Sequence, residues 1–264
     1  MEIIAKISRG SKMDQVYLPR HREGFPLGSY VVVKPLETSQ TSEKPYFYGL
    51  KEIEPVKLGV VHEIFSIISN HLHSYENIFI SGSFLEGGFS FHDIDVFIIH
   101  ERSVDEKRLK EILESRIKIK VHILVLSNVS LLKGLACDPL YQMMLSKVIA
   151  KKRFIYHTQR EIDYKLLDLH LLKSKVLIDN FDILNGNEKY YLVRNMIAIL
   201  NFIKEEKLSK GFVDREIEKV FRAKILDIQQ NMLDKKEFLE RFKQMYQKIF
   251  DLILEGVKHE SKQK

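Results

Sequence analysis

Two closely spaced aspartates and a glycine–serine pair are the residues of this sequence most suited to chemistry. Gly82 and Ser83 follow one apolar run, and Asp93 and Asp95 flank Ile94 at the start of another. Because alternate residues of a strand point to the same side, both carboxylates project together while Ile94 faces the core. The pattern predicts a strand, a glycine-rich turn and a second strand with two acids on one face.

Two unpaired carboxylates this close repel each other, which favours a bound cation between them. Mg²⁺ takes one or two protein carboxylates and completes its shell with water and substrate phosphate. Gly82 lets a phosphate approach the backbone, because no Cβ is in the way. The hydroxyl or amide of Ser83 can donate to phosphate oxygens. The sequence therefore predicts a magnesium site, with Asp93 and Asp95 as ligands, beside a phosphate-binding turn.

The segment 78–99 resembles the signature of the DNA polymerase β-like nucleotidyltransferase superfamily, and most closely its minimal prokaryotic members. The resemblance rests on Gly82-Ser83, a spacer, and an aspartate–apolar–aspartate–apolar sequence that begins at Asp93. It implies an α/β (α+β) core with a mixed sheet and helices on one side. It also implies up to two Mg²⁺ ions on Asp93 and Asp95, and a nucleoside triphosphate on Gly82 and Ser83. The implied reaction transfers a nucleoside monophosphate to an acceptor hydroxyl that the sequence does not identify.

The third carboxylate that this family usually has is missing from the expected strand. The face that presents Lys120 and His122 contains no acid. A neutral His122 can ligate a metal or act as a catalytic base, or it is a hydrogen-bonded histidine on a sheet face. Lys120 contacts phosphate, or extends along the strand with its charge in water. Glu86 in the turn and Glu101 after the second strand are alternative oxygen ligands, and their spacing favours neither.

Three further residues have competing interpretations. His92, next to the first aspartate, contacts phosphate or caps the turn, and we favour the turn. Cys137 has no matching histidine and aspartate pattern, which favours a buried structural thiol. Arg194, in an otherwise apolar stretch, faces a cleft or forms a surface ion pair.

The N-terminal segment is β-rich and resembles one half of an AbrB/MazE-like swapped-hairpin DNA-binding domain. The matching residues are Leu18, Pro19, Arg20, Arg22, Gly28, Tyr30, Val31 and Val33. The resemblance implies a homodimer, because one half cannot bury its sheet alone. Residues 1–37 contain six Lys or Arg and four Asp or Glu, so DNA binding has only a small charge excess to support it. A dimerising or edge-covering β element is the alternative.

The elements that must position the two aspartates alternate between helix and strand. Helices are expected from Pro55, over 104–116 and over 139–150, and strands over 78–81, 94–99, 119–126 and, at an edge, 153–157. In the N-terminal segment, strands are expected over 3–7 and 30–33. Beyond residue 160 the pattern is helical, with segments over 161–180, 188–207, 213–225 and 232–256. These helices resemble, in position, those that two-domain nucleotidyltransferases place across the cleft to hold the acceptor.

Three domains follow from these patterns. Residues 1–45 are expected to form a small β arm with a linker, 46–158 a nucleotidyltransferase domain, and 159–264 a C-terminal helical bundle. The composition, 45% hydrophobic and 30% charged residues in a chain of 264, is typical of a globular protein. No apolar run is long enough to span a membrane. A single cysteine and a charged start without a signal peptide favour the cytoplasm.

The net charge of +6 permits a polyanionic partner without requiring one. Two hypotheses follow from the sequence. The first is a Mg²⁺-dependent nucleotidyltransferase that acts on a nucleoside triphosphate. The second is a DNA-binding or antitoxin-like regulator whose nucleotidyltransferase domain is degenerate and binds only a nucleotide or a partner. The missing third carboxylate and the AbrB-like segment favour the second.

Overall fold

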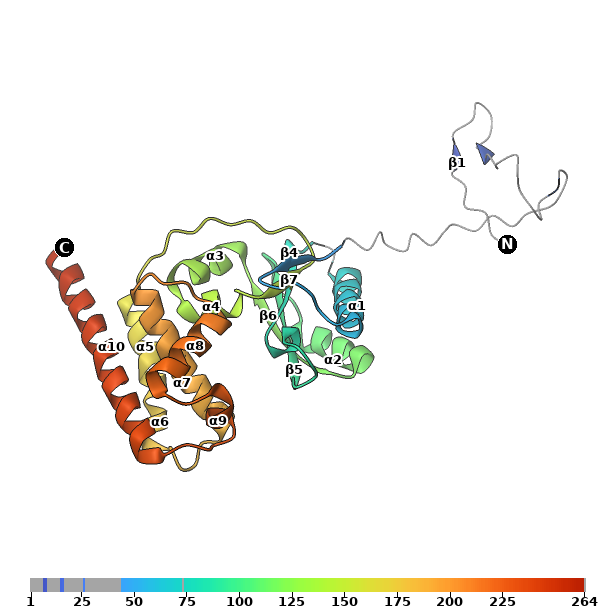
Figure 1. Ribbon diagram of the computed structural model, residues 1–264. Coiled ribbons are helices and arrows are strands. Elements are labelled where there is room, and N and C mark those ends of the chain that lie inside the picture. Colours follow the sequence, from blue (N-terminus) through green and yellow to red (C-terminus); the bar gives the residue numbers. More distant parts are fainter. Residues whose placement is uncertain (1–6, 9–14, 17–25, 27–43, 73, 264) are drawn as a thin grey trace. The chain divides into compact units, whose positions relative to one another are not determined.

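The computed structural model describes residues 7–8, 15–16, 26, 44–72 and 74–263 (Figure 1). The chain divides into two compact units, Met1–Glu43 and Lys44–Lys264. In the first unit, β1 (Ile7–Ser8) and β2 (Gln15–Val16) form an antiparallel pair. The strand expected at 30–33, most of the one expected at 3–7 and most of the expected DNA-binding segment 1–37 lie outside the described residues.

The second unit contains a mixed sheet of five strands in the order β3-β7-β4-β5-β6. The strands are β3 (Tyr46–Tyr48), β4 (Asn77–Ser81), β5 (Asp93–Ile99), β6 (Lys120–Leu126) and β7 (Val148–Ala150). β5 and β6 are parallel and are connected through α2 (Glu106–Ile117), whereas the other neighbouring pairs are antiparallel. Together with the helices, this mixed sheet agrees with the α/β class predicted from the sequence.

Helices cover both faces of this sheet. α1 (Pro55–His71) and α2 pack on one face, and α3 (Asn128–Cys137) and α4 (Pro139–Met144) on the other. In β5, Val96 and Ile98 join the core beneath α1 and α2, while Phe97 and Ile99 join the core beneath α3. The resemblance implied helices on one side only. The fully apolar second half of β5 explains the difference, because it has no polar face to turn toward water.

The segment after α3 differs from the sequence prediction. The helix expected over 139–150 ends at Met144, and Val148, Ile149 and Ala150 form β7, which lies between β3 and β4. Their side chains fill both cores, Ile149 on one face and its two neighbours on the other. The edge strand expected at 153–157 is wrong, because these residues have no regular structure. Three apolar residues between polar ones are too few for periodicity to distinguish a strand from a helix end.

The C-terminal part of the second unit is helical, as predicted. Its helices are α5 (Tyr164–Ser174), α6 (Val176–Asp179), α7 (Gly186–Ile203), α8 (Lys210–Phe221), α9 (Ile225–Gln229) and α10 (Lys235–Gln263). α7 is the central helix, and much of it is buried among α5, α8 and α9. It begins at a capping box, in which Asn185 and Glu188 bond each other's backbone amides. The helices thus have their own core beside the sheet.

No helix in the described part of the chain combines the length and apolar character needed to cross a membrane.

Candidate metal centre

Asp93, Asp95 and His122 come together on one face of the sheet. Nδ1 of His122 lies 3.5 Å from Oδ2 of Asp93 and 3.6 Å from Oδ1 of Asp95. One ligand atom from each residue lies within 4.8 Å of the others, and this is the one such group found among the described histidines, cysteines and acids. The three side chains therefore present two oxygens and a nitrogen to a common point.

The parallel pairing of β5 and β6 explains this arrangement. In the register, Asp93 lies beside Lys120 and Asp95 beside His122. Since neighbouring residues in register point to the same face, all four side chains lie on the face that α3 and α4 cover further along the strands. The adjacent strand β4 runs antiparallel, so that Ser81 pairs with Asp95 at the same edge. The phosphate-binding turn predicted at Gly82 and Ser83 therefore starts beside the two acids.

Electrostatics at this edge disfavour two free carboxylates. Burial raises the pKa of Asp95, the charge of Asp93 raises it further, and the nearby His122 opposes the rise. Ionised Asp95 is thus poorly stabilised by the protein alone, because it is partly withdrawn from water beside a second negative charge. A bound cation would stabilise the charged form of both acids.

The predicted phosphate contacts lie around the acids. Gly82 has a φ of +87° and lies against the carboxylate of Asp95. Ser83 follows at the start of a short 3-10 turn, η1 (Ser83–Leu85), with its side chain exposed. Lys120 is exposed beside Asp93. These three residues thus lie at the ends of the strands that pair with Asp93 and Asp95.

Neither Glu86 nor Glu101 supplies the missing oxygen ligand. Oε1 of Glu101 accepts a hydrogen bond from the amide of Asn128 at the start of α3. The carboxylate of Glu86 pairs with Lys147 and Lys210. Neither residue belongs to the group of ligands around the two aspartates. The third potential ligand at this site is therefore His122.

A buried lysine that the sequence analysis missed fixes the turn between Ser83 and Asp93. Lys57 of α1 is only 1% exposed, and its Nζ donates to the backbone oxygen of Glu86. It also pairs with Glu54, whose carboxylate accepts from the amide of Gly88 at 2.7 Å. The ring centres of Phe84, Phe89 and Phe91 lie 5.4 to 5.8 Å from Nζ of Lys57. The ammonium group of Lys57 thus anchors the turn through this hydrogen bond, and the aromatic rings of the turn help to stabilise its positive charge.

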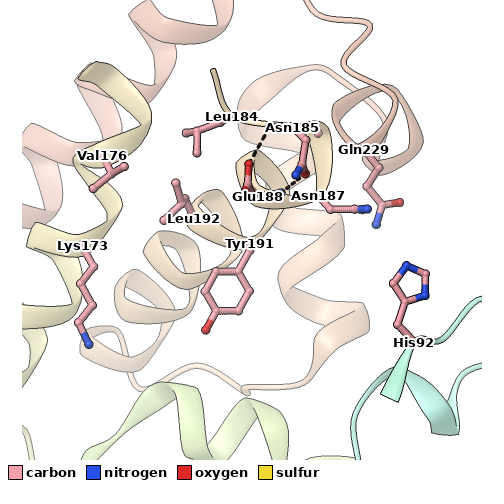
Figure 2. A pocket seen from close by; sticks show the side chains of 11 residues that line it. His92, Lys173, Val176, Leu184, Asn185, Asn187, Glu188, Tyr191, Leu192 and Gln229 are labelled. Atoms are coloured by element: carbon pink, nitrogen blue, oxygen red, sulfur yellow. Dashed lines mark hydrogen bonds between the residues drawn. The ribbon is translucent and has the colours of Figure 1, made fainter. Parts of the chain in front are cut away.

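A pocket of about 650 Å³ lies between His92 and the C-terminal helices (Figure 2). Apolar groups of Val176, Leu184 and Leu192 and the ring of Tyr191 form much of its wall, whereas Gln229 projects near His92. Since His92 immediately precedes Asp93, the pocket lies next to the strand that positions the acids. His92 lines this pocket with its side chain exposed, so the structure gives no support to the turn-capping role.

The two remaining sequence candidates have different outcomes. Cys137 is buried, and its Sγ donates a hydrogen bond to the backbone oxygen of Lys133. Burial raises the pKa of this thiol, and the charge of Asp138 raises it further. These features agree with a structural thiol. Arg194 stacks 4.7 Å from the ring centre of Tyr191, and its Nε is buried without a hydrogen-bond partner. No ion pair of Arg194 occurs among the described residues.

No family model matches the chain, and no curated protein is significantly similar to it in sequence.

Proposed function

We propose that this chain is a divalent-metal-dependent nucleotidyltransferase related to the DNA polymerase β-like superfamily. It transfers a nucleoside monophosphate from a nucleoside triphosphate to an acceptor hydroxyl and releases pyrophosphate. The observation that supports this best is the placement of Asp93 and Asp95 on one face of β5, directly beside the positive-φ turn at Gly82. Paired carboxylates next to a glycine turn are suited to hold a metal and the phosphates that it neutralises.

The donor set fits a small divalent cation. Asp93 and Asp95 provide the carboxylate oxygens that Mg²⁺ prefers, and His122 adds a nitrogen that Mn²⁺ accepts more readily. When bound, the metal supplies charge neutralisation and polarisation of the phosphate under attack. We assign Asp93 and Asp95 as ligands of one or two metal ions, and His122 as the third ligand in place of an acid.

The remaining site residues bind and orient the nucleotide. Gly82 admits a phosphate oxygen close to the backbone, Ser83 donates a hydrogen bond, and Lys120 provides a positive charge. The acceptor oxygen forms a bond to the α-phosphorus while the bond from that phosphorus to the pyrophosphate oxygen breaks. The acceptor proton passes to solvent. The protein contributes mainly orientation and electrostatic stabilisation.

We place the acceptor in the pocket beside His92. Its wall is apolar around Leu192 and Tyr191, with Lys173 and Glu188 as the lysine and the acid of its lining. A lining with this charge balance favours a small, partly apolar hydroxyl compound over a polynucleotide, which requires a basic surface.

Loss of both aspartates tests the proposal. The protein is incubated with Mg²⁺ or Mn²⁺ and each nucleoside triphosphate, together with a mixture of small hydroxyl compounds, and pyrophosphate release is measured. We expect release by the wild type and at least a hundredfold less by Asp93→Ala plus Asp95→Ala. The exposed pair Asp168→Ala plus Asp179→Ala is the matched control and should retain the wild-type rate. Equal rates in all three proteins would refute the assignment.

A second candidate is a regulator that binds a nucleotide without transferring it and binds DNA through residues 1–37. The specific observation that favours it is the histidine, rather than an acid, at the third ligand position. This candidate predicts a salt-sensitive gel shift with duplex DNA that is lost when residues 1–37 are deleted. Absence of DNA binding at low salt would exclude it.

A further inference from the structure

Three lysines converge on Glu86, in the turn between Ser83 and Asp93. Nζ of Lys57 donates to its backbone oxygen, whereas Nζ of Lys147 lies 3.0 Å from Oε2 and Nζ of Lys210 lies 3.5 Å from Oε1. The backbone of Glu86 is thus fixed by a fully buried lysine. Its carboxylate, in contrast, lies between two lysine side chains that are 31% and 41% exposed. A ligand can reach these two lysines from solvent.

Lys147 lies beside the phosphate-binding turn. The hydroxyl of Ser81 donates to the backbone oxygens of Met144 and Lys147, at 2.6 and 3.3 Å. Ser81 directly precedes Gly82, so this contact places the Lys147 backbone next to the start of the turn. Lys210 is the first residue of α8, and its ion pair with Glu86 links the helical part to the turn.

The surroundings of Glu86 contain more cationic groups than acids. Burial raises the pKa of the nearby Asp214, and the charge of Glu86 also raises it, whereas the charges of Lys210 and Arg194 lower it. Asp214 accepts a 2.6 Å hydrogen bond from the hydroxyl of Tyr190. Lys210 thus lies near both acids, Glu86 and Asp214, and Nε of Arg194 is buried without a hydrogen-bond partner. If Glu86 moves away, Lys147 and Lys210 lose the acid with which they form ion pairs.

Glu86 is charged at neutral pH. Burial of its carboxyl opposes ionisation, but the hydrogen bond from Lys147 and the charges of Lys210 and Lys147 outweigh burial and lower its pKa. The carboxylate is thus a negatively charged group between two lysines. Like a terminal phosphate, it presents negatively charged oxygens to both lysines.

We propose that the Glu86 carboxylate is a built-in occupant of an anion subsite formed by Lys147 and Lys210, and that the terminal phosphates of the incoming nucleotide displace it. The inference rests on the proposed function, since the nucleotide is the source of the anion. Displacement disfavours small anions, because a single phosphate has few other contacts with which to compete against Glu86. A polyphosphate that is also held at Gly82 and Ser83 competes well. Glu86 therefore selects for ligands with several linked phosphates.

Calorimetric titration of the full chain with inorganic pyrophosphate, in the absence of metal, tests the subsite. We expect Glu86→Gln to bind pyrophosphate about tenfold more tightly than the wild type, because the occupant has lost its charge. Lys147→Met plus Lys210→Met should bind at least tenfold more weakly. Lys110→Met breaks the Lys110–Glu114 pair on α2 and should bind as the wild type does. Glu86→Ala provides a second removal of the carboxylate, and circular dichroism checks the fold of each variant.

Two results would overturn the proposal: pyrophosphate binding by folded Glu86→Gln and Glu86→Ala no tighter than by the wild type, or full binding by the double lysine variant. Different results would contradict the proposed function. Tight pyrophosphate binding that depends on the lysines, without nucleotide transfer under any condition, would contradict the transferase and leave the anion subsite intact. Transfer with a KM for nucleotide that the lysine substitutions do not change would contradict the subsite alone.

Discussion

A Cβ atom at position 82 would lie 2.2 Å from Oδ2 of Asp95. No real Cβ makes so short a contact, so a side chain at Gly82 forces the carboxylate to move. The φ of Gly82, +87°, independently disfavours any residue with a Cβ. Gly82 is therefore required by the position of the Asp95 carboxylate, which we propose as a metal ligand.

Gly82→Ala should impair the site far more than the fold. We expect a loss of stability of about 1 to 2 kcal/mol from the backbone conformation, and a loss of transfer activity of about a hundredfold from displacement of Asp95. Gly87→Ala is the matched control in the same turn, because a Cβ there contacts nothing within 4 Å. Steady-state kinetics and thermal melts distinguish the two effects. An unimpaired Gly82→Ala enzyme would show that Asp95 does not need its present position.

Asp95→Asn should stabilise the metal-free protein at neutral pH. Burial and the charge of Asp93 raise the pKa of Asp95 in the folded protein. The carboxyl therefore favours folding at a pH below its pKa in the unfolded chain, and this stabilisation is lost as the pH rises through its pKa in the folded protein. The amide removes this cost, and we expect the variant to have a higher Tm than the wild type at neutral pH. Mg²⁺ should raise the Tm of the wild type but not that of the variant. A lower Tm for metal-free Asp95→Asn would argue against the strained carboxylate pair.

Metal affinity should depend on pH for the same reason. Protons compete with the metal for Asp95, so Mg²⁺ binding should begin to weaken at a higher pH than it does at a carboxyl of ordinary pKa. Calorimetric titration between pH 5 and pH 8 measures this dependence. A loss of affinity that begins only at the pH expected for an ordinary carboxyl would be inconsistent with a raised pKa.

His122→Asp should change the preferred metal. A third carboxylate replaces the imidazole nitrogen, and oxygen ligands suit Mg²⁺ better than mixed ligands do. We expect the ratio of Mg²⁺-supported to Mn²⁺-supported activity to rise about tenfold. Lys120→Asp adds an acid beside Asp93, two register positions from His122, and should not produce the same change. If both variants keep the wild-type ratio, His122 is not a ligand.

Lys57→Met should loosen the turn between Ser83 and Asp93, which connects the proposed phosphate-binding residues to the proposed metal ligands. Loss of the ammonium group leaves the backbone oxygen of Glu86 without this donor, at a cost of about 1 to 3 kcal/mol. We expect a lower Tm and faster hydrogen exchange over residues 84–92, with a lower kcat. Lys51→Met, an exposed lysine just before α1, should behave like the wild type. Wild-type exchange in this turn after Lys57→Met would contradict the supporting role.

Local spacing made part of this site predictable. Asp93, Asp95 and Gly82 lie in one segment, so strand periodicity and the need for a glycine turn identify them from sequence alone. The proximity of His122 depends on the register of β5 and β6, which the sequence suggests but does not determine. Lys57, Lys147 and Lys210 were not identified, because each acts on Glu86 from an element distant in sequence.

The fold, like the site, was predictable from the sequence only in part. The long periodic helices and the strands β4, β5 and β6 were predictable, whereas β7 was not. Its three residues are identifiable as a strand only because β3 and β4 pair with them on both sides. Tertiary pairing determined their conformation, and a short apolar run gives little sign of such pairing.

The position of a radioactive label in the nucleotide tests the central claim most directly. The protein is incubated with Mg²⁺ or Mn²⁺, a mixture of hydroxyl acceptors and a nucleoside triphosphate labelled at either the α- or the γ-phosphate. Nucleotidyl transfer predicts that the α label enters a new product and the γ label leaves as pyrophosphate, with both outcomes abolished by Asp93→Ala plus Asp95→Ala. Transfer of the γ label to product, or α-label transfer by the double variant at the wild-type rate, would contradict the account.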